Sequence, residues 1–167
     1  MGAPPGTPLN QIPLTGLFEI AIDAMLAEFR VDLAEAGYDD LRPTHGCVFR
    51  FVHDDGLRLT ELAALAGLTK QSVGEIVDEL VALGYVERVP DPADKRAKLI
   101  CLTPKGEQAQ LTAFGLFARI QDRWAKRYGA DRIATLRSLL EEIALTELPD
   151  AVPELSRPAP SELAAAT

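Results

Sequence analysis

Residues 59–80 read LTELAALAGLTKQSVGEIVDEL and contain two short helical patterns joined by a turn. A helix-turn-helix needs a small residue where its helices touch, a glycine in the turn and branched apolar residues anchoring the second helix. Four residues meet these needs at the expected spacings: Ala63, Gly67, Val73 and Ile76. Thr60 is expected to cap the first helix, over residues 61–66. This stretch therefore predicts a helix-turn-helix.

The second helix, expected over residues 70–83 with Thr69 as its N-cap, has one apolar and one polar face. At 100° per residue the apolar face is Val73, Ile76, Val77 and Leu80, and the opposite face is Gln71, Gly74, Glu75 and Asp78. Such a helix can present Gln71 to base edges. Lys70, Ser72 and the N-terminal amides would then contact phosphate.

A β-hairpin is predicted directly after this helix. Residues 85–89 and 97–103 are β-rich and enclose the polar tip PDPADKR at 90–96. The basic residues of the hairpin are Arg88 at its base and Lys95, Arg96 and Lys98 near its tip. A cationic hairpin after a helix-turn-helix is suited to a narrow minor groove. The alternative is that these are only solvated charges.

Helical patterns flank this region on both sides. A long amphipathic helix is expected from residue 14 to about 37, and a second helix from about 44 to 54, followed by a short strand at 57–59. Two further helices are expected over 104–128 and 131–146. The apolar stripe of the first of these is Leu111, Phe114, Phe117, Ala118, Gln121, Trp124 and Tyr128. The expected fold is mainly α with a small antiparallel β wing.

The domain organisation follows from composition. Residues 1–13 and 149–167 are rich in Pro, Ala, Gly and Ser and are expected to be disordered tails. Between them, 14–148 is expected to be a single domain. Its winged helix-turn-helix spans about 41–106, and its dimerisation helices span about 14–37 and 104–146.

The charge of the chain is unevenly distributed. The net charge is −8, but residues 58–106 hold seven Lys and Arg against seven Asp and Glu, a balance of zero. The acidity therefore lies outside the predicted helix-turn-helix and hairpin. No apolar run reaches the roughly 18–20 residues that span a bilayer, and no export signal is evident. With two cysteines and no metal-type spacing, the chain is expected in a reducing cytoplasm.

Residues 66–106, AGLTKQSVGEIVDELVALGYVERVPDPADKRAKLICLTPKG, resemble the bacterial multiple-antibiotic-resistance regulator (MarR) family. The likeness includes Asp94 and Arg96 on either side of Lys95, followed by the LTPKG segment at 102–106. Weaker likeness extends over roughly 14–146. The resemblance implies a winged helix-turn-helix transcription regulator, either a repressor or an activator, that binds a pseudopalindromic operator as a homodimer.

The resemblance also assigns roles to residues. Arg96 would enter the minor groove, Asp94 would orient basic side chains, and Gln71 with its neighbours would read the major groove. The full set of expected DNA contacts is Thr69, Lys70, Gln71, Ser72, Glu75, Arg88, Asp94, Lys95, Arg96 and Lys98. Glu75 departs from the family, which often has a basic residue there. Either it accepts a hydrogen bond from a cytosine amine or its charge weakens the attraction to phosphate.

The terminal helices carry more apolar surface than one winged domain can cover, which predicts a dimer. The expected interface residues are Leu17, Phe18, Ile22, Met25, Ile133, Leu136, Leu140 and Ile143. Family members often sense a small molecule, so His45 and Trp124 are candidates for an effector pocket. For Trp124, packing in the dimer core is the stronger interpretation.

Other groups are assigned structural roles. His45, Cys47 and His53 lie within nine residues, but no further ligand completes a metal set, so we expect no metal and no cofactor. Cys47 and Cys101 sit among apolar neighbours and are expected to be buried, inert thiols. No catalytic arrangement is present in the sequence. The alternative to a DNA-binding regulator is a dimeric winged-helix module that binds another protein and no DNA.

Overall fold

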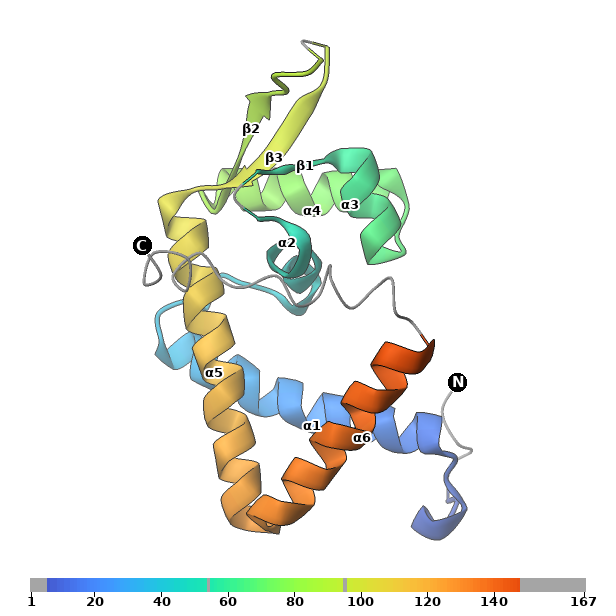
Figure 1. The fold of residues 1–167 in the computed structure, drawn as a ribbon. Helices are drawn as coiled ribbons and strands as arrows, with labels where there is room; N and C mark the ends of the chain where they lie inside the picture. The colour runs from blue at the N-terminus through green and yellow to red at the C-terminus, as the bar shows by residue number, and fades with distance from the viewer. Residues whose placement is uncertain (1–5, 54, 95, 148–167) are drawn as a thin grey trace, which may run out of the picture.

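The computed structural model describes residues 6–53, 55–94 and 96–147, which form a lobe carried on a stem of long helices (Figure 1). The winged lobe comprises residues 43–102. The stem consists of α1 (Leu14–Glu35), α5 (Pro104–Tyr128) and α6 (Ala130–Glu147). Figure 1 shows α5 running from the base of the lobe to the far end of the stem, where α6 turns back. One continuous helix therefore belongs to both parts.

The winged lobe contains three short helices before its hairpin. The order is η2 (Pro43–His45), α2 (Gly46–Phe51), β1 (Leu57–Arg58), α3 (Leu59–Ala66), α4 (Lys70–Ala82), β2 (Val86–Pro90) and β3 (Lys98–Leu102). The helices α3 and α4 form the predicted helix-turn-helix. Gly67 ends α3 with φ of +63°, a left-handed conformation that glycine adopts without a side-chain penalty.

The hairpin belongs to a three-stranded antiparallel sheet in the order β1-β3-β2. Val86 pairs with Leu102 and Pro90 with Lys98, while Leu57 of β1 pairs with Ile100 on the other edge of β3. The short strand β1 thus joins the helix-turn-helix to the wing. The lobe core lies beneath the sheet and is built from Val48, Val52, Leu62, Val73, Val77, Leu80, Tyr85, Val86 and Ile100.

Two local predictions in the lobe were wrong. The helix expected over 44–54 is a 3-10 turn followed by one short α-helix, because Val52 adopts an extended backbone (φ −81°, ψ 122°) that leads into β1. The helix α3 begins at Leu59 with Arg58 as N-cap, not at Thr60. Its first turn is closed by the Glu61 carboxylate, which accepts the Arg58 backbone N–H at 2.9 Å.

Aromatic stacking and ion pairs between α1 and α5 stabilise the stem. The rings of Phe29 and Phe117 lie parallel with centroids 4.2 Å apart. Arg123 donates to Glu28 at 3.1 Å and to Asp32 at 2.9 Å, and the indole of Trp124 donates to Glu28 at 2.9 Å. These hydrogen bonds with Glu28, Trp124 first and Arg123 second, hold the pKa of Glu28 below its usual value.

The buried stripe of α5 differs from the predicted one. The side chains that pack inward are Ala109, Leu116 and Ile120, whereas Phe114 is 73% exposed and Tyr128 48% exposed. The predicted stripe is a second apolar face. Its Phe117 and Trp124 contact α1, whereas Phe114 and Tyr128 face solvent in the single chain. A 3.6-residue period identifies apolar faces but does not say which of two such faces meets the same chain.

The predicted tails are described only in part. Leu9–Gln11 forms one turn of 3-10 helix (η1) within the segment expected to be disordered. The expected C-terminal tail, 149–167, lies outside the described residues. The expected fold class, mainly α with a small antiparallel wing, is confirmed.

The stem and the lobe approach closely at the first turn of α5, and a substitution there tests this packing. A Cβ added at Gly106 would lie 2.0 Å from the Tyr85 carbonyl oxygen, a backbone atom that cannot move independently. We expect Gly106→Ala to lower the free energy of unfolding by about 1–3 kcal/mol, since overpacking outweighs the helix propensity that alanine adds. Denaturant unfolding at fixed protein concentration measures this.

Gly115→Ala is the matched control, because it lies in the same helix and its added Cβ meets no atom within 4 Å. It should leave stability unchanged or raise it by up to about 1 kcal/mol. A Gly106→Ala protein as stable as the wild type would contradict the packing described here.

Candidate nucleic-acid interface

The helix α4 is anchored on one side and open on the other. Val73, Val77 and Leu80 are fully buried in the lobe core. Helical geometry therefore turns Gln71 and Glu75 directly away from the core, and both are exposed. The outer face of α4 is the surface that a helix-turn-helix offers to a major groove.

The N-terminus of α4 is capped as predicted. The Thr69 hydroxyl accepts the Ser72 backbone N–H at 3.1 Å, and the two hydroxyl oxygens lie 2.8 Å apart. Thr69, Lys70 and Ser72 are all exposed at this end of the helix. The cap fixes where α4 begins and therefore which side chains occupy its first turn.

The three carboxylates of α4 have different partners. Asp78 receives Arg88 from β2 at 2.5 Å, and Glu79 is paired with Arg42 and lies 3.0 Å from His45 Nε2. Glu75 accepts a hydrogen bond from the neutral amide of Gln71 at 3.2 Å. Arg88, expected to contact DNA, is thus held by the helix beside it.

The wing tip is a tight turn with exposed cations. Within it, Ala97 N–H donates to Asp94 O at 2.8 Å and Asp91 N–H donates to Ala97 O at 3.1 Å. Arg96 and Lys98 are exposed, and Lys95 lies outside the described residues. The Asp94 carboxylate accepts the backbone N–H of Arg96 at 3.0 Å, so it shapes the turn and does not hold the guanidinium of Arg96 or of Arg88.

A partly buried ion pair that the sequence pattern did not predict fixes the wing to the helix-turn-helix. Arg58, the N-cap of α3, donates through Nε and Nη2 to one oxygen of Asp91 at 2.7 and 2.5 Å. Asp91 is only 6% exposed, and its other oxygen accepts the Ala93 N–H at 2.7 Å. The Ala93 amide and the Arg58 guanidinium hold the pKa of Asp91 below its usual value. The Asp-Pro sequence signals a turn, but nothing local points to a partner 33 residues earlier.

Comparison with known proteins points to one family. Residues 39–97 match the model of the MarR family. The multiple antibiotic resistance protein MarR of Escherichia coli K12 is 32% identical over 84 residues, a match that covers 50% of this chain and 58% of that protein. These matches support a MarR-family winged-helix protein.

Solved structures of similar fold match a longer part of this chain. The reduced form of E. coli MarR superposes with a TM-score of 0.69 at 25% identity, covering 79% of this chain and 96% of that one. The transcriptional repressor CouR, solved with a 23-mer DNA duplex, superposes with a TM-score of 0.62 at 26% identity, covering 79% and 92%. The MarR-type arrangement of lobe and stem thus extends beyond the stretch matched in sequence.

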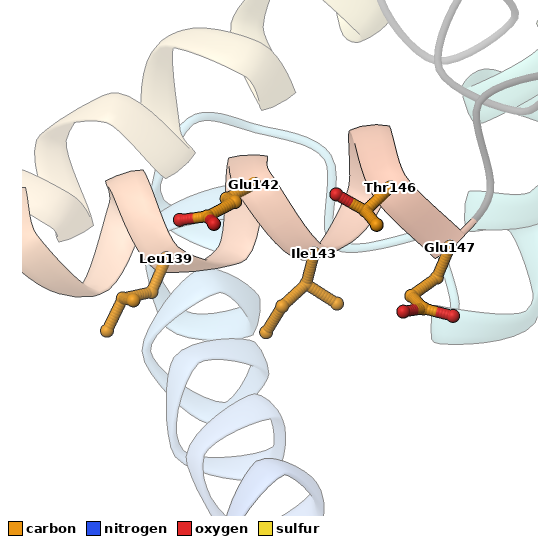
Figure 2. Close-up of a pocket in the computed structure, with 5 residues that line it drawn as sticks. All are labelled: Leu139, Glu142, Ile143, Thr146 and Glu147. Atoms are coloured by element: carbon orange, nitrogen blue, oxygen red, sulfur yellow. The ribbon is translucent and has the colours of Figure 1, made fainter.

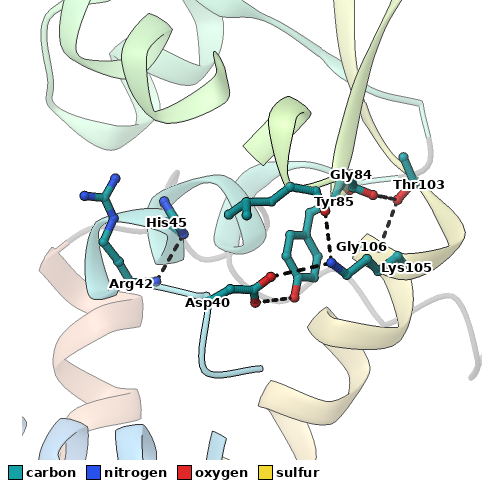
Figure 3. Close-up of polar contacts among 9 residues, drawn as sticks. Asp40, Arg42, His45, Gly84, Tyr85, Thr103, Lys105 and Gly106 are labelled. Carbon is teal, nitrogen blue, oxygen red and sulfur yellow. Dashed lines mark hydrogen bonds and ion pairs between the residues drawn. The ribbon is translucent and has the colours of Figure 1, made fainter. Parts of the chain in front are cut away.

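A polar junction joins the lobe to the stem (Figure 3). The Tyr85 hydroxyl donates to Asp40 at 2.6 Å, in the loop that follows α1. Lys105, from the first turn of α5, lies 3.8 Å above the Tyr85 ring and donates to the Leu83 carbonyl at 2.9 Å. Burial and the hydrogen bond to Asp40 raise the pKa of Tyr85 well above its usual value, so the hydroxyl stays a donor.

The two candidate pocket residues have separate partners. Buried His45 accepts the Arg42 backbone N–H at Nδ1, 3.1 Å away, so its Nε2 carries the proton that faces Glu79. Trp124 is bonded to Glu28 in the stem. No contact among the described residues brings His45 and Trp124 together, and the effector pocket stays a prediction.

Both thiols are partly buried. Cys47 donates to the Thr44 carbonyl at 3.2 Å, and burial raises its pKa above the ordinary value. Burial likewise raises the pKa of Cys101 in β3. Within residues 6–53, 55–94 and 96–147, no three His, Cys, Asp or Glu side chains are grouped closely enough to hold a metal ion. None of the helices in these ranges has the length and hydropathy of a membrane span.

The buried imidazole predicts a pH dependence of stability. Burial first, and Arg42 second, lower the pKa of His45 below 6.5, so the unfolded chain takes up this proton more readily than the folded one. The free energy of unfolding should therefore fall as the pH drops from about 6.5 toward the folded-state pKa. His45→Asn keeps an acceptor for the Arg42 N–H but does not titrate. It should show a smaller loss of stability between pH 7 and pH 5 than the wild type.

The chain has one other histidine, so His53→Asn serves as the matched control and should keep the wild-type pH dependence. Urea unfolding of the three proteins at several pH values makes the comparison. Equal pH profiles for His45→Asn and the wild type would count against the assignment.

Proposed function

We propose that this protein is a DNA-binding transcription regulator that acts as a homodimer on a pseudopalindromic operator, by binding and not by catalysis. The observation that carries the proposal is the fixed pairing of an open α4 face with an ordered wing. The Arg58–Asp91 ion pair fixes the wing to the start of α3, and the Arg88–Asp78 ion pair fixes β2 to α4. Two such lobes related by a two-fold axis would address half-sites about 10–10.5 base pairs apart.

The distribution of basic side chains supports DNA as the partner. Arg42, Arg58 and Arg88 are engaged by carboxylates of the lobe. In the described part of the lobe, the exposed cations outside those ion pairs include Lys70 at the start of α4, and Arg96 and Lys98 on the wing. They sit where phosphate and a minor groove would lie. The DNA-bound CouR structure, a relative of the same fold, supports the same partner.

Apolar surface on the stem supports a homodimer. No side chain of α6 is buried, and Leu136, Leu139, Leu140 and Ile143 are 42–53% exposed. Figure 2 shows a shallow hollow along this helix, lined by Leu139, Ile143 and polar neighbours. Phe18 and Ile22 of α1 are also exposed. Exposed apolar surface of this extent usually marks an interface.

A protein-binding module without DNA binding is the second candidate. The observation that favours it is the acidic character of α4, which has three carboxylates and one lysine. Two of those carboxylates are already paired with arginines, so the repulsion toward phosphate is smaller than the formal charge indicates.

In the regulator we propose, binding is also modulated by a small ligand or another signal.

Selection of bound sequences from a random duplex library tests DNA binding, and Arg96→Ala tests the wing. We expect enrichment of a two-fold symmetric site. Arg96→Ala should weaken binding to all duplexes, most at A·T-rich flanks, because the inserted guanidinium gains from the negative potential of a narrow minor groove. The slope of log K against log salt should become shallower by about 0.9 per subunit.

Arg30→Ala, an exposed arginine on α1, is the matched control and should retain wild-type affinity and slope. Circular dichroism checks the folding of both variants. If no duplex is enriched by the wild type, the protein-binding alternative is favoured. Unchanged affinity and slope in folded Arg96→Ala would exclude the wing from the interface.

The stem surface predicts the oligomeric state. We expect sedimentation at micromolar concentration to give twice the chain mass of 18.1 kDa. Leu136→Lys combined with Leu140→Lys should produce monomers, since each change places a charge in the apolar interface. Ser138→Lys lies two residues along and thus on the opposite side of α6, so it should remain dimeric. A wild-type monomer would refute the dimer.

A further inference from the structure

We propose that Glu75 reads the exocyclic amine of a cytosine in each half-site, and that Gln71 positions it. This inference rests on the proposed DNA-binding function and adds the base and the atoms that are recognised. The starting observation is geometric. Glu75 lies in the first half of α4, on the face opposite Val73, Val77 and Leu80, one turn from Gln71.

The charge of Glu75 is the reason to single it out. Arg88 compensates Asp78, and Arg42 compensates Glu79. Among the described residues, the partner of the Glu75 carboxylate is an amide, which orients it and leaves its charge intact. Near phosphate such a charge is unfavourable. It becomes favourable only where a base edge offers a hydrogen-bond donor.

Base chemistry then selects cytosine. An ionised carboxylate only accepts hydrogen bonds. In the major groove guanine presents the acceptors N7 and O6, and thymine presents the acceptor O4. These acceptor atoms repel the carboxylate. Adenine offers an N6 amine beside the N7 acceptor, whereas cytosine offers its N4 amine without an adjacent acceptor in its own ring. A carboxylate at this position therefore favours cytosine over the other three bases.

Gln71 completes the arrangement as a positioning residue. By donating one amide N–H to Glu75 Oε1 at 3.2 Å, it limits the rotamers of the glutamate and leaves the second oxygen, Oε2, for a base. The Glu75 side chain therefore loses less conformational entropy when DNA binds, because it is already partly ordered in the free protein. Gln71→Ala should reduce the preference for cytosine at the Glu75 position without replacing it by another base.

The test begins with sequence selection by the full chain and its variants. The wild type should enrich a site with a cytosine at one fixed position of each half-site. Glu75→Ala should make that position degenerate and leave the others unchanged. Glu75→Gln should shift it to adenine, because a glutamine pairs with adenine N6 and N7. Glu87→Ala removes the same charge from an exposed position on β2 and should keep the cytosine.

An atomic substitution in the DNA isolates the contact. Replacing the selected cytosine by 2-pyrimidinone removes only the 4-amino group. The wild type should lose about five- to 150-fold in affinity per half-site, and Glu75→Ala less than about twofold on the same duplex. The difference between the two proteins cancels any effect of the analogue on the duplex itself.

The failures are distinguishable. If the wild type enriches a site but Glu75→Ala keeps the same base preferences, or only binds all duplexes more tightly, the glutamate acts by general repulsion and the inference is overturned. A guanine or thymine at the Glu75-dependent position overturns it as well. If the wild type enriches no duplex at all, the proposed function fails and this inference fails with it.

Discussion

Tyr85 contacts both the loop after α1 and the start of α5, and it lies where α4 has ended and β2 is about to begin. Its hydroxyl holds Asp40 after α1, its ring carries Lys105, and its carbonyl accepts the Thr103 N–H at 3.0 Å and the Thr103 hydroxyl at 3.2 Å. The same carbonyl excludes any side chain at Gly106. The direction in which α5 leaves the lobe is set by these contacts, and the placement of the stem relative to the helix-turn-helix depends on them.

The features that were predictable from the sequence are those with local causes. The Thr69 cap, the left-handed Gly67 turn, the buried face of α4 and the bounds of α5 all depend on residues within one or two turns of each other. The MarR-like stretch around the wing added the order of elements. The fold class followed from these signals together.

The features that were not predictable depend on residues far apart in the chain. Arg58 and Asp91 meet because β1 joins the sheet beside β3, and a two-residue strand leaves little trace in the sequence. Arg88 faces Asp78 because β2 returns along α4, so its role in the lobe was invisible before the elements were placed. The two apolar faces of α5 differ only in their partners. Pattern alone favoured the exposed one, which carries Phe114.

The continuity of α5 makes it a lever arm. Its 25 residues span about 37 Å at 1.5 Å per residue, with the lobe at one end and the hinge to α6 at the other. A tilt of about 5° at the stem end would move the lobe by about 3.2 Å, close to the base-pair step of about 3.4 Å. In the proposed dimer on DNA, small changes in how the two stems meet would thus be amplified into a change of register along the duplex, and the lobe itself need not deform.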